Sequence, residues 1–213
     1  MFIPLVDSLR CPKPHDETWL VASIERAEER DILEGILGCP ACLAEYPIHD
    51  GVVWFDTSVS RTPFLPPDEI QATRIAAALD LIDPRMIAVL HGDWGAHAQL
   101  VRAISPAQLL LVNPPEGIVS GDGISIVLSD TAPLGVASMD AAAVDLTANE
   151  GMAASLRASL RGGRRMLGPA AMALPAFLIE LARDDDVWVA QLEAGMVTSA
   201  PVLPTRRSRI EHQ

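Results

Sequence analysis

Several features that would mark a well-known class of protein are missing from this sequence. The first nine residues are too short and too poor in positive charge for a signal peptide, and no apolar run approaches the length of a membrane-spanning helix. The sequence has no Walker phosphate loop, no Ser-His-Asp spacing and no pair of acids in a recognisable catalytic frame. We therefore expect a cytoplasmic protein with no membrane partner, and we predict no catalytic residue.

Positive charge is also scarce. The 213 residues include 16 Lys and Arg against 28 Asp and Glu, which gives a formal net charge of −12. An acidic balance of this size disfavours broad electrostatic capture of nucleic acid. Basic residues cluster only in two short runs, Arg161–Arg165 and Arg206–Arg209. A local patch that faces RNA is therefore the one form of nucleic-acid binding that we keep as an alternative.

Cysteine occurs only three times, and an odd count fits reduced thiols better than a disulfide framework. All three cysteines fall in two short segments: Cys11 stands four residues before His15, and Cys39 stands three residues before Cys42. Zinc favours four sulfur or nitrogen ligands in a closed tetrahedron, and two such knuckles supply them. We predict a structural zinc site, with ordinary buried or redox thiols as the alternative.

The segment around these ligands predicts a small β domain over residues 1–57. Trp19–Ile24 and Ile32–Gly38 are β-rich runs that suggest a hairpin, and Val52–Phe55 suggests a closing strand. Ala22–Leu33 could instead form a short helix. A domain of this size has a small core, so a bound metal would add the stability that it lacks.

This segment resembles the small zinc-ribbon family of methyltransferase activators, which includes an activator of tRNA methyltransferases. The resemblance is carried by Leu9-x-Cys11-Pro12, Gly35-x-Leu37-x-Cys39-Pro40-x-Cys42 and Tyr46-Pro47-Ile48-x-Asp50-Gly51-Val52. It implies a ribbon that packs on a methyltransferase and stabilises it. The chain departs from the family at His15, where a cysteine is usual; His49, the rival ligand, lies in a turn where the family tolerates many residues.

Residues 58–67 carry Ser, Thr and prolines without apolar periodicity and predict a linker. Over residues 68–204 apolar runs alternate with helical patterns, which predicts an α/β, Rossmann-like, doubly wound sheet. Residues 205–213 form a polar tail. The expected strands and helices are Asp68–Leu81 (helix), Met86–Leu90, a helix ending at Ile104, Gln108–Val112, Ile124–Leu128, Ala141–Leu146, Gly151–Leu160 (helix), Arg165–Leu167, Pro175–Arg183 (helix), and an antiparallel edge of Val187–Leu192 and Met196–Leu203.

This arrangement resembles the class I S-adenosylmethionine-dependent methyltransferase fold. Glycines follow the first strand, Met139-Asp140-Ala141 leads into the fourth, and Leu160-Arg161-Gly162-Gly163-Arg164 precedes the fifth. The resemblance implies S-adenosylmethionine as a cofactor, beside the structural Zn²⁺. The residues that it places at the cofactor are Gly92, Asp93, Gly95, Asn113 and Asp130.

Departures from the family pattern affect the predicted cofactor loop. Trp94 and Ala96 stand where the family usually has glycine, and Leu90 or His91 stands where an acid is usual. The second strand ends in Asn113, which can accept a hydrogen bond but lacks the charge of the usual acid.

Three further groups of residues keep two interpretations each. Asn113-Pro114-Pro115 can be a catalytic motif or a rigid loop; His91 and His97 can be a base or ligand, or core histidines; Asp184-Asp185-Asp186 can bind a hard cation or form a solvated turn.

The main hypothesis is a zinc-binding, methyltransferase-like protein that is non-catalytic and acts as a scaffold or regulator. Its partner would be a methyltransferase or another protein, and a homodimer is a further option. The alternatives are an active methyltransferase with an atypical cofactor loop, and a module that binds another small ligand.

Overall fold

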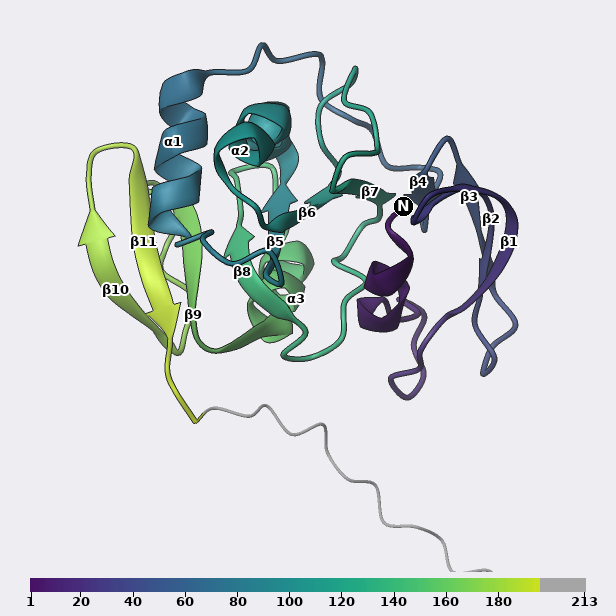
Figure 1. Ribbon diagram of the computed structural model, residues 1–213. Helices are drawn as coiled ribbons and strands as arrows, with labels where there is room; N and C mark the ends of the chain where they lie inside the picture. Colours follow the sequence, from purple (N-terminus) through teal and green to yellow (C-terminus); the bar gives the residue numbers. More distant parts are fainter. Residues whose placement is uncertain (196–213) are drawn as a thin grey trace, which may run out of the picture.

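One sheet of eleven strands runs through the whole molecule (Figure 1). The structure is a computed structural model, and it describes residues 1–195. The strand order is β1-β2-β3-β4-β7-β6-β5-β8-β9-β11-β10. The strands are β1 (Val21–Glu28), β2 (Asp31–Gly38), β3 (Glu45–His49), β4 (Val52–Trp54), β5 (Ile87–His91), β6 (Gln108–Val112), β7 (Ile124–Leu128), β8 (Met139–Ala143), β9 (Leu160–Pro169), β10 (Leu178–Arg183) and β11 (Val187–Leu192).

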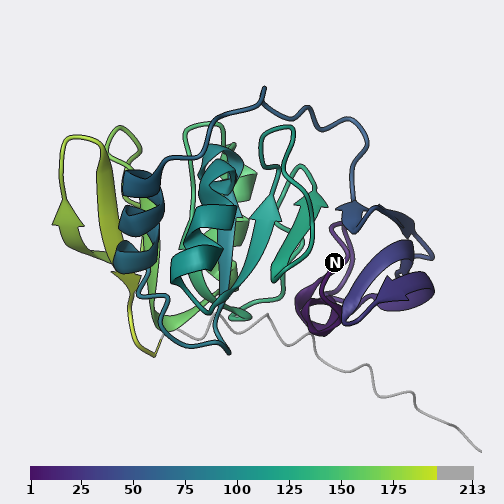
Figure 2. The same ribbon diagram turned by 45° about the horizontal axis from the view of Figure 1, so that its top comes forward.

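The central strands β7, β6, β5, β8 and β9 are parallel, and helices cover both of their faces. Helices α1 (Glu69–Ala78) and α2 (Ala98–Ile104) lie on one face, and α3 (Glu150–Ser159) lies on the other (Figure 2). Consecutive residues of β5 serve the two sides: Leu90 packs in the core under α1 and α2, and Val89 packs in the opposite core. This is the predicted doubly wound α/β fold.

Local sequence explains where the two longer helices begin. The carboxylate of Asp68 accepts hydrogen bonds from the N–H groups of Ile70 and Gln71, at 2.7 and 3.0 Å. The side chain of Asn149 caps α3 in the same way and accepts from the N–H of Met152 at 2.7 Å. Such caps satisfy N–H groups that have no partner within the helix.

The N-terminal ribbon continues the central sheet. β1 to β4 pair antiparallel with one another, and β4 then pairs parallel with β7, with Val53 opposite Val127. Two 3-10 helices complete the elements, η1 (Ile3–Ser8) under the ribbon and η2 (Gly92–His97) after β5. Buried ribbon residues such as Leu37 and Ile48 share one apolar core with α3 and its face of the sheet. Whether the ribbon and the second part fold as separate domains stays a prediction.

The carboxyl-terminal edge differs in detail from the sequence prediction. Pro175–Arg183 was predicted as a helix, but Leu178–Arg183 is strand β10, which pairs antiparallel with β11 after a short turn. β11 also pairs antiparallel with β9, so the sheet has an antiparallel edge as predicted, but its outer strand is β10, which had been predicted as a helix. The predicted strand Met196–Leu203 lies outside the described residues.

Three longer strand connections in the described part of the chain carry no helix: residues 113–123 between β6 and β7, residues 129–138 between β7 and β8, and residues 170–177 between β9 and β10. Among the helices of residues 1–195, none has the length and apolar character needed to cross a membrane.

Candidate functional site

The four predicted metal ligands come together at one end of the ribbon. Cys11 and His15 stand on the loop after η1, and Cys39 and Cys42 stand on the turn after β2; their ligand atoms all lie within 4.8 Å of one another. The Sγ atoms of Cys11 and Cys42 are 3.7 Å apart, and Sγ of Cys39 is 3.4 Å from Nε2 of His15. A tetrahedral zinc ion with ordinary bond lengths places such atoms roughly 3.5–3.8 Å apart, so the donor set fits the ion.

Groups around the cluster hold the donors in a ligating state. The Nδ1 of His15 lies 2.6 Å from the carbonyl oxygen of Asp16, which leaves Nε2 free to face Cys39. Burial opposes ionisation of Cys39, but the backbone N–H groups of Cys42 and Ala41 outweigh it and lower the pKa of this thiol to about 7. Cys39 therefore reaches the thiolate, the form that binds metal, more easily than an ordinary cysteine.

Tyr46 is a ligand-supporting residue that the sequence did not reveal as such. Its hydroxyl lies 3.1 Å from Sγ of Cys11. Burial, and then the hydrogen bond to Cys11, raise the pKa of Tyr46 well above its usual range, so it remains a donor to the sulfur. His49, the rival ligand, lies elsewhere, with its Nδ1 3.1 Å from a carboxylate oxygen of Glu34.

The predicted cofactor loop is held closed by a residue that the sequence analysis missed. Asp145 follows β8, and its carboxylate accepts from the backbone N–H of Asp93 at 2.7 Å and from the Thr147 hydroxyl at 2.6 Å. His91 lies with Nδ1 2.9 Å from the same carboxylate. Gly92 has a φ of +59°, and a Cβ there would collide with the Asp145 carboxylate. The loop is thus packed against an acid of its own chain.

Burial and polar contacts act on Asp145 in opposite directions. Burial raises its pKa, but the hydrogen bonds from His91, Thr147 and the Asp93 backbone outweigh that effect and leave the pKa below its ordinary value. The carboxylate is therefore ionised at neutral pH and has its charge met by protein donors. His91 and Asp145 are both almost fully buried, which makes them parts of the loop's internal network.

The side chain of Asn113, one of the predicted cofactor residues, is hydrogen-bonded within the sheet. Its Nδ2 donates to the carbonyl of Ser129 at 2.8 Å, and its Oδ1 accepts from the N–H of Ser129 at 2.9 Å. This pair ties the ends of β6 and β7 together. Asp130, another predicted cofactor residue, accepts from Nδ2 of Asn149 at 3.1 Å.

The predicted linker crosses the loops that follow β5 and β6, and we call residues 61–68 the strap (Figures 1 and 2). Arg61 donates from Nε to the carbonyl of Pro114 at 2.8 Å and from its terminal nitrogen to that of Pro115. The hydroxyl of Thr62 donates to Asp93 at 3.1 Å. Burial lowers the pKa of Arg61, which is consistent with a guanidinium covered by the loops that it binds.

Gly95 completes the closure, because a Cβ there would lie 2.7 Å from Cβ of Pro114. The loops after β5 and β6 therefore touch where a ligand would have to enter. In open α/β sheets ligands bind outside the carboxyl ends of the strands, where the strand order reverses. Here that place, at the ends of β5 and β8, is filled by the His91–Asp145 network.

A surface hollow of about 460 Å³ remains beside the strap. Its lining includes Trp94, His97 and Asp186. The indole Nε1 of Trp94 donates to the carbonyl of Val144 at 2.9 Å, and Nδ1 of His97 accepts from the N–H of Asp68 at 3.0 Å. Both side chains thus brace the loop.

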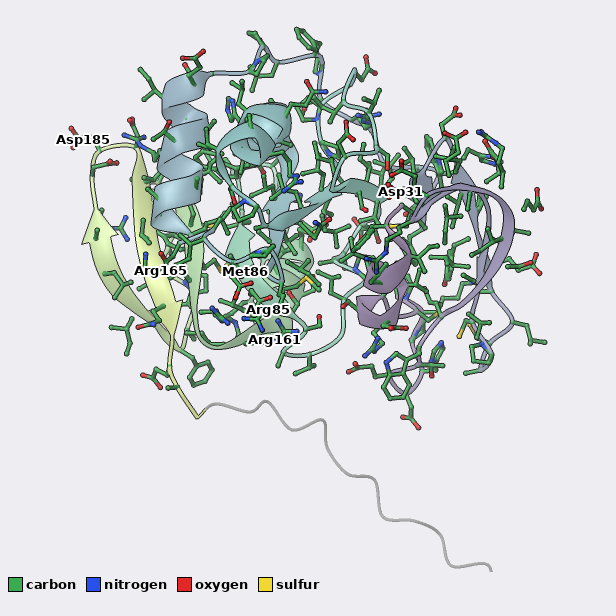
Figure 3. All side chains as sticks on the ribbon, viewed as in Figure 1. Asp31, Arg85, Met86, Arg161, Arg165 and Asp185 are labelled. Carbon is green, nitrogen blue, oxygen red and sulfur yellow. The ribbon has the colours of Figure 1, made fainter. Side chains whose placement is uncertain are left out.

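The remaining charged candidates pair within the chain. Asp184 accepts from the N–H groups of Asp186 and Val187, at 2.9 and 2.8 Å, as in a solvated turn, and Arg74 lies 3.3 Å from its carboxylate. Figure 3 shows Asp185 at the tip of this turn, directed outward.

The arginine run on β9 contacts a buried acid at the start of β8. Arg161 and Arg164 both bind Oδ1 of Asp140, at 2.7 and 3.3 Å. Figure 3 places Arg161 at the lower end of the sheet. The second predicted run, Arg206–Arg209, lies outside the described residues.

The comparisons with known proteins found similarity in fold alone. No family model and no curated protein matches the chain, so the resemblance of the ribbon to methyltransferase activators stays a prediction. Solved methyltransferase structures do align with it. The mycinamycin-pathway methyltransferase MycE matches 61% of this chain and 49% of its own, at 11% identity and a TM-score of 0.46.

Two further solved structures match less closely in fold. A putative methyltransferase, yhhF from Escherichia coli, covers 62% of this chain and 92% of its own, at 15% identity and a TM-score of 0.40. Geranyl diphosphate C-methyltransferase from Streptomyces coelicolor A3(2) covers 46% and 43%, at 13% identity and 0.39, so the match spans less than half of that protein. Values this low say nothing about activity, and function is argued from the site.

Proposed function

We propose that this protein is a non-catalytic, methyltransferase-like scaffold whose ribbon is stapled by zinc. The observation that carries the proposal is the internal satisfaction of the cofactor loop. Asp145 binds the backbone of Asp93, Asn113 binds the backbone of Ser129, and Arg61 of the strap binds the loop after β6. A nucleoside cofactor would have to displace buried polar contacts, each costing about 1–3 kcal/mol if left unmade.

The position of the ribbon supports the same proposal. In the activator family that the ribbon resembles, the ribbon packs on a methyltransferase; here β4 pairs with β7 of the same chain. The pairing occupies the β4 edge, and the shared core buries the ribbon face behind it. A separate partner would therefore bind another surface of the ribbon.

Zinc would act as a structural staple in this function. Cys11, His15, Cys39 and Cys42 would hold it, and a site with four protein ligands leaves no open position for a substrate. Its contribution would be to join the loop after η1 to the turn after β2, which fixes the ribbon on the sheet.

Isothermal titration of the zinc-loaded protein with S-adenosylmethionine and with S-adenosylhomocysteine tests the proposal. We expect no binding of either compound. A dissociation constant in the micromolar range for either one would overturn the scaffold and favour the alternative of an active methyltransferase.

A strap variant makes the titration sharper. Arg61→Ala combined with Thr62→Ala removes the side-chain hydrogen bonds from the strap to the loops after β5 and β6, while the networks of Asp145 and Asn113 stay in place. We expect this variant also to bind neither compound. Binding by the variant alone would show that the strap, and not the loop itself, excludes the cofactor, and the protein would then be an autoinhibited methyltransferase.

A further inference from the structure

Leu43 is an unusual residue for its position. It has a φ of +58°, in the left-handed region that glycine and asparagine adopt most easily, and its side chain is 82% exposed. Its N–H donates to the carbonyl of Cys39 at 2.9 Å, so the conformation belongs to the metal knuckle. An exposed leucine in this conformation helps neither the backbone nor the core, and such an outlier points to a function.

Leu43 borders an apolar groove on the outer face of the ribbon. The groove has a volume of about 350 Å³. Its walls include Val21 of β1 and Ile36 of β2, and a Cβ on Gly38 would meet only the Val21 carbonyl oxygen, at 3.8 Å. Gly38 therefore leaves open space in the groove that packing within the chain does not require.

The groove lies along a free edge of the sheet. Among residues 1–195, β1 is the terminal strand and pairs only with β2, whereas β4, at the other side of the ribbon, pairs with β7. The register of β1 is regular over Val21–Ile24 and irregular after it. A short regular edge beside an apolar groove is suited to an added strand, which gains main-chain hydrogen bonds and side-chain contacts together.

The net charge of the ribbon indicates the charge that a binding partner should carry. Residues 1–57 contain eleven Asp and Glu against four Lys and Arg, a formal balance of −7 within the chain's −12. Glu45 lines the groove itself; Glu25 and Glu28 stand farther along β1, where Arg26 pairs with Glu28 and Glu34. One acid at an apolar groove, on a ribbon that is acidic as a whole, favours a partner that carries basic residues between apolar ones.

We propose that this groove binds an extended protein segment of alternating apolar and basic residues, which adds to β1 along Val21–Ile24. The proposal rests on the scaffold function and names the chemistry of its partner. Its failure can be told from a failure of the scaffold function, because the first is measured with a peptide and the second with S-adenosylmethionine. A second copy of the chain, paired through β1, is the competing occupant.

Fluorescence anisotropy with a labelled peptide of alternating valine and arginine tests the proposal on the full, zinc-loaded chain. We expect saturable binding that is weaker by about tenfold or more when glutamate replaces arginine in the peptide. Amide hydrogen exchange of Val21–Ile24 should slow when the peptide is bound. No saturable binding, or equal binding of the acidic peptide, would overturn the proposal.

Leu43→Asn is the decisive variant, because asparagine suits a positive φ and should leave the melting temperature equal or higher. It should weaken peptide binding by about tenfold, as loss of an anchor side chain does. The matched control is Ile82→Asn, a 76% exposed apolar residue in the loop before β5, which should leave binding unchanged. Equal binding by the two variants would overturn the proposal, as would a free protein that is a dimer and becomes monomeric in Leu43→Asn.

Discussion

The two groups of chemistry-bearing residues in this chain differ in what their polar atoms already bind. In the ribbon, the donor atoms of Cys11, His15, Cys39 and Cys42 face one another across the space of one ion. In the loop after β5, the polar groups face protein partners, with Asp145 at their centre. The first group has the geometry of a metal site, whereas the polar atoms of the second already have partners within the protein. Residues that match a family pattern thus indicate a binding site only when their polar or ligating atoms are not already bonded within the protein.

Loss of the metal should have the largest effect. Cys39→Ser, or treatment with a strong chelator, should unfold the ribbon, because structural zinc sites contribute about 10–16 kcal/mol of apparent binding free energy in small zinc domains. The shared core behind Leu37 and Ile48 should loosen with it. Metal analysis and circular dichroism, followed against temperature, measure both effects.

The histidine pair supplies the control for this prediction. His15→Ala should lose zinc much more readily than His49→Ala, because only His15 faces the cysteines, whereas His49 contacts Glu34. Equal loss of metal from the two variants would refute the ligand assignment.

Removal of the Asp145 carboxylate tests the other half of the comparison. Asp145→Ala leaves the N–H of Asp93, the ring of His91 and the hydroxyl of Thr147 without their acceptor. We expect a loss of about 3 kcal/mol in the free energy of unfolding, since each buried unmade hydrogen bond costs about 1–3 kcal/mol. Denaturant unfolding measures it.

Asp185→Ala is the matched control, because this acid lies at the exposed tip of the β10–β11 turn and should change stability by less than about 0.5 kcal/mol. A loss for Asp145→Ala as small as that of the control would mean that the loop is not held by its own network, and the cofactor cleft would have to be considered open.

The sequence could predict elements whose determinants are local. Gln108–Val112 and Ile124–Leu128 were predicted to the residue, because each is an apolar run bounded by turn residues. That Cys11, His15, Cys39 and Cys42 come together was also predictable, since each knuckle is a short segment with a fixed spacing; that they bind zinc stays a prediction.

Long-range pairing accounts for what the sequence could not predict. Asp145 was placed inside an expected strand, Ala141–Leu146, whereas β8 ends at Ala143 and frees the acid for a backbone group 52 residues away. Leu178–Arg183 has helix-favouring leucine and alanine, but its pairing with β11 outweighs that propensity. The parallel pairing of β4 with β7 could not be predicted, because neither segment has a sequence feature that specifies the other as its partner.

Restoring the family's acid at the end of β6 should not restore cofactor binding. Asn113→Asp keeps an acceptor for the N–H of Ser129 but loses the donor to its carbonyl, so we expect a loss of about 1–2 kcal/mol in stability. Titration with S-adenosylmethionine should still show no binding. A gain of binding in this variant would show that the missing charge, and not the closed loop, is what excludes the cofactor.

The smallest predicted effect is a pH dependence that arises from His97. Burial lowers the pKa of His97, and Asp68 and Asp93 offset this only in part, so the folded protein keeps the ring neutral at a pH where the unfolded chain already binds a proton. The free energy of unfolding should therefore fall as the pH drops through the ordinary histidine pKa, about 6.5, and level off below the folded pKa, with a slope of at most about 1.4 kcal/mol per pH unit. His97→Asn keeps an acceptor for the N–H of Asp68 and cannot titrate. Between pH 7.5 and 5, the free energy of unfolding of this variant should therefore fall less than that of the unmodified protein, and the difference is the contribution of the one histidine proton. If the free energy of unfolding of the two proteins changed equally with pH, His97 would already be solvated in the folded protein. The strap, whose Asp68 contacts His97, would then cover the loop less tightly than the contacts of Arg61 indicate.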